Sequence, residues 1–211
     1  YFSAVRRICD RHGALLILDE VMCGMGRTGT MHAWEQEDVT PDIEIVAKGL
    51  GGGYQPIGGI LIHGKIVEAI RAGSGAFMHG HTYQAHPVAC AAALAVIDAM
   101  AEEKLPERGA KLGARAMARM RTWIDRFPCL GDVRGIGAMV AIELVTDRST
   151  REPDADLTNQ VLRYCHGHGL AILKAGLYDN VVRLLFPLTI SYAVFCLKKK
   201  IIEEGLAASK A

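Results

Sequence analysis

The sequence predicts an α/β fold built on a mostly parallel sheet, followed by a small α+β domain. Short apolar runs that end at polar residues alternate with helical patterns in the first half, as in sheets whose strands are joined by crossovers. An alanine-rich stretch over residues 87–103 has the high helix propensity of a long connecting helix. Half of the 211 residues are hydrophobic, so a sizeable core can be buried. We therefore predict a larger domain over residues 1–103 and a smaller one over residues 104–211.

The first predicted element is a helix whose pattern already includes residue 1. Apolar side chains recur on one stripe from Phe2 through Val5 to Cys9, and Gly13 ends the pattern. Because Tyr1 is not a methionine and lies inside this pattern, we expect the chain to begin in the middle of a fold.

Three buried strands and two helices complete the first part. Each strand is predicted from an apolar run that is too short for a typical helix. Ligands of such sheets bind outside the carboxyl ends of the strands, which is where Asp19 and Lys48 stand. The elements are strands at Ala14–Leu18, Ile43–Val46 and Gly58–Ile62, helices at Lys65–Arg71 and Pro87–Glu103, and a loop over Gly73–Thr82.

The second part mixes helices with strand-like runs. Leu112, Met120 and Phe127 belong to an apolar pattern at helical spacing, which Pro128 and Gly131 break. The elements that follow are a strand at Met139–Val145, a helix through Leu157, Val161 and Cys165, a strand at Val181–Phe186, and a helix capped by Ser191 that runs through Ile201.

Charge and composition favour small-molecule partners. The 24 basic and 23 acidic residues leave a formal net charge of +1, which gives no reason to expect nucleic acid or an anionic membrane as partner. We expect no membrane span, because no segment reaches the ~20 apolar residues required, and no secretory signal. The cysteines include no Cys-x-x-Cys pair and are typical of a reduced, cytoplasmic protein.

Lys48 is the first candidate for chemistry. It ends an apolar run and is followed at once by the glycine-rich stretch Gly49–Gly53. Glycines permit a carbonyl cofactor to approach the backbone closely, so that the amine can condense with it. The same pattern also fits a phosphate-cradling loop or a solvated turn lysine, and these residues alone leave the three interpretations open.

Asp19 is the second candidate, because a carboxylate at the end of a buried strand needs a cation or several donors. In one interpretation Asp19 or Glu20 caps the following turn or pairs with Arg27. In the other, Asp19 keeps a pyridine nitrogen protonated while Lys48 holds the same ring through an imine.

Histidine pairs offer a metal site as a further candidate. Each pair flanks a glycine, but neither has the accompanying cysteine or carboxylate spacing of a metal centre, so we predict no metal. The pairs are His79 with His81 and His166 with His168.

Several separated motifs follow one another along nearly the whole chain. They are Leu18-Asp19-Glu20-Val21, Gly24, Gly26-Arg27-Thr28-Gly29, Pro41-Asp42, Ala47-Lys48-Gly49-Leu50-Gly51-Gly52-Gly53, Gly80-His81-Thr82-Tyr83, Pro87, Ala89, Cys90, Val133-Arg134-Gly135, Val182-Arg183-Leu184-Leu185 and Pro187-Leu188. Together they resemble the signature of class III aminotransferases, pyridoxal 5'-phosphate (PLP) enzymes of fold type I. The resemblance implies the carboxyl-terminal part of the large PLP-binding domain with its long connecting helix, followed by the small domain.

The resemblance also implies a role for each matched residue. Lys48 would form a Schiff base with PLP and shuttle a proton during catalysis, and Asp19 would stabilise the pyridinium. Val21 would pack on the ring face. Thr82 would donate its hydroxyl to the cofactor phosphate of a neighbouring subunit, which implies a homodimer with a shared active site. Arg183 would bind a substrate carboxylate.

Met22 departs from the pattern of many family members, which carry glutamine at this position to reach the phenolic oxygen of the cofactor. Methionine cannot donate that hydrogen bond, and an apolar residue here resembles the branch that acts on ω-amino acids and amines. The implied reaction moves an amino group from such a donor to a 2-oxo acid such as pyruvate. The family's phosphate cup and second ring-stacking residue precede this region, so the chain is expected to be a fragment.

Other functions fit the same residues. An aminomutase, a decarboxylase or an epimerase of the same fold would also use Lys48 and Asp19. A phosphate-binding module without catalysis and a truncated, inactive remnant are the alternatives from other classes.

Overall fold

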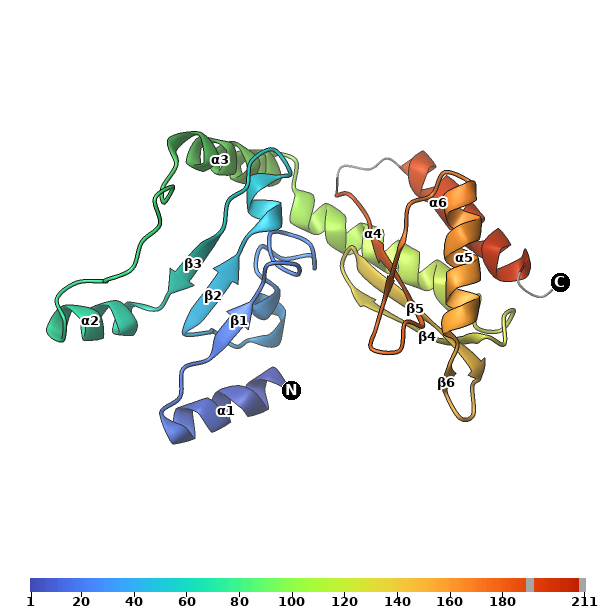
Figure 1. Cartoon of the computed structure of the whole chain (residues 1–211), viewed down its shortest axis with the longest axis horizontal. Coiled ribbons are helices and arrows are strands. Elements are labelled where there is room, and N and C mark those ends of the chain that lie inside the picture. Colours follow the sequence, from blue (N-terminus) through green and yellow to red (C-terminus); the bar gives the residue numbers. More distant parts are fainter. Residues whose placement is uncertain (189–191, 209–211) are drawn as a thin grey trace. The chain divides into compact units, whose positions relative to one another are not determined.

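The computed structural model describes residues 1–188 and 192–208 and divides the chain into two compact units, Tyr1–Glu107 and Arg108–Ala211 (Figure 1). The domain division after residue 103 stays a prediction about the whole protein. Ser191, the predicted cap of the last helix, lies outside the described residues.

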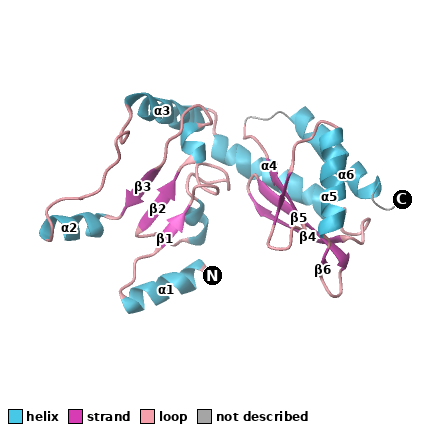
Figure 2. Ribbon diagram, viewed as in Figure 1, coloured by secondary structure: helices cyan, strands magenta, loops and turns pink. Residues whose placement is uncertain are grey.

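The first unit holds a three-stranded sheet in the order β1-β2-β3, with helices before and after it (Figure 2). Strand β1 runs parallel to β2, whereas β3 runs antiparallel to β2, so this sheet is mixed and not parallel throughout. The elements are α1 (Phe2–His12), β1 (Ile17–Asp19), η1 (Ala33–Glu37), β2 (Ile43–Val46), η2 (Lys48–Gly51), β3 (Gly59–Ile62), α2 (Gly64–Ala72) and α3 (Pro87–Glu102).

Local sequence accounts for several of these boundaries. Gly13 ends α1 in the left-handed conformation at φ 64°, which glycine adopts without steric cost. Pro87 occupies the first turn of α3, where a missing N–H does no harm, and the His86 side chain accepts a hydrogen bond from the Ala89 amide. Strand β1 begins later than predicted, at Ile17, because only residues 17–19 pair with β2.

The second unit is an antiparallel sheet covered by helices. Its five-stranded sheet has the order β4-β5-β8-β7, with β6 paired to β5. The Asp154 side chain caps α5 by accepting a hydrogen bond from the Leu157 amide. The chain enters this unit along α4 (Leu105–Arg121), and the elements that follow are β4 (Leu130–Ile136), β5 (Met139–Asp147), β6 (Glu152–Pro153), α5 (Ala155–Gly167), β7 (Leu173–Ala175), β8 (Val181–Leu185) and α6 (Tyr192–Ala208).

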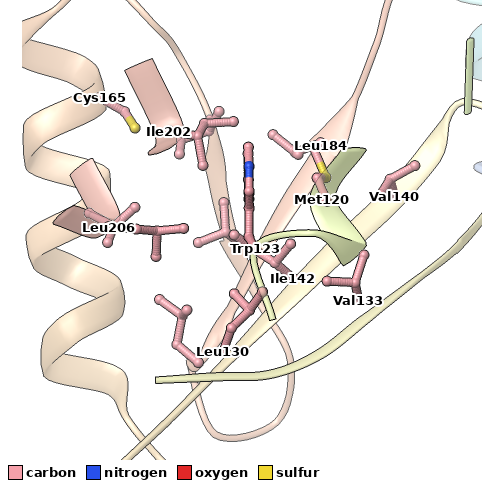
Figure 3. Packing of buried hydrophobic residues seen from close by; sticks show 14 of the residues in the cluster. Met120, Trp123, Leu130, Val133, Val140, Ile142, Cys165, Leu184, Ile202 and Leu206 are labelled. Carbon is pink, nitrogen blue, oxygen red and sulfur yellow. The ribbon is translucent and has the colours of Figure 1, made fainter. Parts of the chain in front are cut away.

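A hydrophobic cluster fills the second unit. Its largest fully buried side chain is Trp123, which Figure 3 shows among neighbours from the sheet and the helices. The cluster of buried residues is Ala116, Met120, Trp123, Phe127, Leu130, Val133, Ala138, Val140, Ile142, Leu144, Leu157, Val161, Cys165, Leu170, Ile172, Val182, Leu184, Phe186, Ile202 and Leu206.

Replacing Trp123 with alanine is expected to destabilise the second unit by about 3–5 kcal/mol, because it removes buried apolar area and leaves a cavity. Replacement with phenylalanine should cost less, since it keeps much of the ring and also removes the indole N–H, which has no hydrogen-bond partner among the described residues. Urea-induced unfolding measures both changes. Leu177→Ala, at a side chain that is 89% exposed, is the control and should leave the midpoint nearly unchanged.

The first unit is tied together by an ion cluster at Asp42. This buried carboxylate accepts hydrogen bonds from Arg6 Nη1 at 2.9 Å and from the Leu16 amide at 2.7 Å, and it pairs with Lys65. Burial by itself would raise the pKa of Asp42. The Lys65 ammonium, the Leu16 amide and the Arg6 guanidinium outweigh that effect and hold the pKa well below its usual range. The Asp42 side chain thus links α1, the residue that precedes β1, and α2.

Asp42→Asn is expected to lower the melting temperature at neutral pH, by about 2–4 °C for each kcal/mol lost. A folded-state pKa below the unfolded value of about 3.9 means that the stabilisation is fully present above pH 4 and is lost as pH falls through the folded value. The difference between variant and wild type should therefore shrink below about pH 4. Thermal melts from pH 7 to pH 2 measure this, with the exposed Glu37→Gln as control. A constant difference down to pH 2 would contradict the assignment.

Within residues 1–188 and 192–208, no helix combines the length and apolar character needed to cross a bilayer. The cysteines described, Cys9, Cys23, Cys90, Cys129 and Cys165, form no disulfide bond among the described residues.

Candidate active site

Asp19 and Lys48 stand at the carboxyl ends of neighbouring parallel strands. Asp19 is the last residue of β1 and lies opposite Ile45 of β2, and the Glu20 amide continues the pairing by donating to Ile45 O at 2.9 Å. Lys48 follows β2 after a single residue and begins the short helix η2. The parallel register therefore delivers a carboxylate and an amine to the same edge of the sheet.

The Asp19 carboxylate is exposed and only partly engaged. Its Oδ1 accepts a hydrogen bond from the Val21 amide at 3.0 Å, which is the turn-capping contact considered from sequence. Among the described residues, Oδ2 has no hydrogen-bond partner and the carboxylate forms no ion pair. One oxygen thus fixes the side chain against its own turn, and the other stays available to a ligand.

The Lys48 side chain is exposed and lies beside Met22. Its Nζ is 2.6 Å from Met22 Sδ, and it forms no ion pair within the described part of the chain. The Lys48 backbone has φ 44°, a left-handed conformation that is strained for a residue with a side chain. Such strain persists where the surrounding structure enforces it and gathers at functional sites. The residues that end and follow β1, namely Asp19, Val21 and Met22, thus lie at the same edge of the sheet as Lys48, which contacts Met22.

The glycines after Lys48 serve packing within the protein. A Cβ on Gly49 would lie 2.8 Å from Met25 Cβ, and one on Gly52, at φ 58°, would lie 2.7 Å from Val96 Cγ2 of α3. Gly53 has open space around it. The expected approach of a cofactor to this stretch stays a prediction, whereas Gly49 and Gly52 are required for η2 to fit between Met25 and α3.

Two buried carboxylates below this edge were not predicted as part of the site. Glu20 Oε2 and Oε1 accept hydrogen bonds from the amides of Ala33 at 2.7 Å and Trp34 at 2.8 Å. Glu44 of β2 contacts His32 Nδ1 at 2.6 Å and Trp34 Nε1 at 2.9 Å. We call these five residues the carboxylate bracket. Glu44 was recognisable from sequence, because it interrupts the apolar run of a buried strand.

Thr82 lies apart from this group in the loop between α2 and α3. Its side chain is exposed and makes no hydrogen bond within the described part of the chain. The flanking residues His81 and Tyr83 line a pocket of about 610 Å³, whose other wall comes from residues 55–58. Thr82 is therefore exposed, next to a pocket, and forms no hydrogen bond with Lys48.

Arg183 belongs to the second unit, on β8, where it pairs with Ala141 of β5 and Leu173 of β7. Its Nε atom is buried and has no hydrogen-bond partner among the described residues. The Nε–H group of a guanidinium is a hydrogen-bond donor, and here that capacity is unused among the described residues. Its role toward a substrate stays a prediction.

A comparison of the sequence with models of protein families identifies the family of the chain. The family model for aminotransferase class-III matches residues 1–204. The chain belongs to the class-III aminotransferases. The resemblance found in the separated motifs is thereby confirmed over nearly the full sequence of this class-III aminotransferase chain.

Its relatives include enzymes with different names. The 5-aminovalerate aminotransferase DavT of Pseudomonas putida is 43% identical over 203 residues, which cover 96% of this chain and 46% of DavT. A leucine/methionine racemase of Thermococcus litoralis is 41% identical over 206 residues, covering 98% of this chain and 43% of the racemase. The class-III aminotransferase chain thus spans less than half the length of these curated relatives.

A solved structure agrees with the fold. An amine transaminase from an uncultivated Pseudomonas species, in its PLP-bound form, matches with a TM-score of 0.92 at 38% identity, over 99% of this chain and 48% of that one. This likeness confirms the predicted α/β fold class.

Proposed function

We propose that the protein containing this chain is a PLP-dependent aminotransferase, which moves an amino group between an ω-amino acid or amine and a 2-oxo acid such as pyruvate. The observation that carries the proposal is the placement of the Lys48 amine and the Asp19 carboxylate at the ends of adjacent parallel strands. Class-III family membership and the DavT relative support the reaction class.

The residues present fit PLP. The cofactor needs an amine that can condense with its aldehyde and an anion beside its ring nitrogen. This edge of the sheet offers both, and within the described residues neither the Lys48 amine nor the Asp19 carboxylate forms an ion pair. When bound, PLP supplies an electron-accepting ring for deprotonation of the substrate. Lys48 would hold the cofactor covalently and move a proton with its amine once released.

The residues next to Lys48 and Asp19 would shape the pocket. Asp19 would keep the proton on the ring nitrogen through Oδ2, while the Val21 amide fixes Oδ1. Val21 would pack on the ring face. Met22, in contact with Lys48 Nζ, would give the cofactor an apolar neighbour where many relatives have an amide.

The remaining predicted partners are part of this proposal. Thr82, presented outward, would donate its hydroxyl to the PLP phosphate of a neighbouring subunit, so that a homodimer shares its active sites. Arg183 would bind the carboxylate of an amino acid or 2-oxo acid, for which a guanidinium is suited. We also propose a cytoplasmic location, in keeping with the free thiols described.

A racemase reaction is the second candidate, because the Thermococcus litoralis relative bears that name. Removal and return of a proton at the same carbon would use Lys48 and Asp19 in the same places. Incubating the complete protein with PLP, a panel of amine donors and pyruvate separates the two. Formation of alanine supports the aminotransferase, whereas inversion of an amino acid without any alanine supports the racemase.

Covalent mapping tests the cofactor itself. The complete protein is saturated with PLP, reduced with borohydride and digested, and its peptides are weighed. The proposal requires the mass of reduced cofactor on Lys48. Absence of that mass from a saturated protein would favour a phosphate-binding module or an inactive remnant.

A further inference from the structure

Glu20 and Asp19 are consecutive residues that face opposite sides of the sheet edge. Side chains alternate along an extended strand, so the carboxylate that follows Asp19 is directed away from it. Asp19 is exposed, whereas Glu20 is 3% exposed. One side chain of the pair therefore faces the candidate site, and the other lies in the interior directly behind it.

The Glu20 carboxylate is held at both oxygens by backbone amides. Its donors, Ala33 and Trp34, are the first two residues of η1, whose N–H groups have no partner within that short helix. Gly24 donates its amide to Glu20 O at 3.0 Å and has no Cβ that would collide with that carbonyl. The turn after β1 is thus closed around Glu20.

The other half of the carboxylate bracket belongs to the strand that leads to Lys48. Glu44 of β2 holds the side chains of His32 and Trp34. Residues 32–34 are consequently bound to the end of β1 through Glu20 and to β2 through Glu44. The same turn links the strand that presents Asp19 with the strand that presents Lys48.

Hydrogen bonding accounts for this group better than metal coordination does. Single ligand atoms of Glu20, His32 and Glu44 lie within 4.8 Å of one another, a spacing that a metal ion could bridge. However, each of the four carboxylate oxygens already has a protein nitrogen within 2.9 Å. Burial raises the pKa of Glu20, and the Ala33 and Trp34 amides act against that rise. The amides therefore favour the charged carboxylate that the bracket requires.

We propose that Glu20 is a positioning residue: by fastening residues 33 and 34 beneath the end of β1, it fixes the direction in which Asp19 meets the ring nitrogen of the cofactor. The proposal rests on the proposed function, because it assigns a task to Asp19. Glu20 itself does not touch the cofactor. Its effect passes through the one peptide bond that joins it to Asp19.

Two substitutions remove the contact from opposite ends. Glu20→Gln keeps the size of the side chain but replaces one acceptor oxygen with an NH₂ group that faces an amide donor. Ala33→Pro removes one donor and leaves Glu20 intact. Proline is tolerated at the first position of a helix, and the preceding His32, at φ −113° and ψ 138°, has the backbone conformation that a following proline requires. Glu35→Ala is the matched control, because Glu35 caps the same turn from its exposed side.

The measurements use the complete protein loaded with PLP. The absorbance of the bound cofactor is followed from pH 5 to pH 10, together with kcat and KM for the 2-oxo acid and the melting temperature. For Glu20→Gln we expect kcat to fall about tenfold, the order of one hydrogen bond to a charged group, with KM unchanged. The midpoint of the absorbance titration should move in the same direction as in Asp19→Asn. Ala33→Pro should show a smaller shift in that direction, and Glu35→Ala none.

The outcomes separate this proposal from the proposed function. If Glu20→Gln and Ala33→Pro both keep the wild-type midpoint and kcat, even with lower melting temperatures, Glu20 is only structural and the proposal fails. If Glu20→Gln does not fold, Ala33→Pro decides by itself through the same midpoint. If the wild-type protein takes no cofactor on Lys48, the proposed function fails and this proposal with it.

Discussion

Replacing Lys48 with alanine is expected to prevent covalent attachment of PLP and to lower kcat/KM by at least about 10²–10⁴-fold, the range for removing an acid–base group. The loss of the covalent link should add to that reduction. Lys48 follows β2 in a strained left-handed backbone conformation, and among the described residues the one hydrogen-bond partner of its amine is Met22 Sδ. No other lysine is expected to take its place, because the register of β1 and β2 sets its position relative to Asp19.

Two further variants separate the chemistry of Lys48 from its charge. Lys48→Arg keeps a cation but cannot condense with an aldehyde at neutral pH, so it should be as inactive as the alanine variant. Lys111→Ala, at an exposed lysine of α4, should behave as wild type. Peptide mapping after borohydride reduction and steady-state kinetics measure both effects. Retention of the cofactor mass on another lysine in Lys48→Ala, with activity preserved, would contradict the assignment.

Local patterns predicted most of the helices and the strands nearest the site. The apolar run at residues 43–46 is β2, and the pattern ending at Gly13 is α1, because short-range periodicity and a glycine terminator determine both. Pairing was harder to predict. The sheet was predicted to be mostly parallel, yet β3 runs antiparallel to β2, because a short apolar run looks the same whichever way the strand runs.

The strands missed in the second unit have a similar cause. Strand β4 (Leu130–Ile136) contains two glycines and two charged residues, so it lacks an apolar run, and its long pairing with β5 compensates for that composition. The predicted helix through Phe127 ends at Arg121, since the residues after it form turns around the buried Trp123. Tertiary packing thus overrides local propensity at both places.

The sequence likewise predicted only some of the residues of the candidate site. Lys48, Asp19, Val21 and Met22 were predicted because ordered motifs and strand ends mark them. The carboxylate bracket was missed, because Glu20 and Glu44 meet His32 and Trp34 only after the turn has folded back between β1 and β2. Thr82, in the loop between α2 and α3, and Arg183, on β8 of the second unit, stay predictions, because a motif can name a residue but cannot position it.

Asp19→Asn is the second variant with a large expected effect, because it removes a charge while leaving the local contacts in place. The asparagine carbonyl can still accept the hydrogen bond that Asp19 Oδ1 receives from the Val21 amide at 3.0 Å. What is lost is the anion that, in the proposed function, would keep the ring nitrogen protonated. A hydrogen bond between charged partners is worth about 1.5–3 kcal/mol, so kcat should fall by about 10–100-fold or more.

The activity of Asp19→Asn should also depend on pH differently from that of the wild type. A carboxylate beside the ring nitrogen raises the pKa of that nitrogen, because it favours the protonated form. Without the charge, the nitrogen loses its proton at a lower pH, so the activity of Asp19→Asn should decline earlier as pH rises. Asp19→Glu should restore part of the activity and move the profile back. The control is Asp38→Asn, an exposed acid at φ 51° where asparagine is also tolerated. An Asp19→Asn profile that matches wild type would show that the ring nitrogen does not depend on this carboxylate, and it would remove Asp19 from the site.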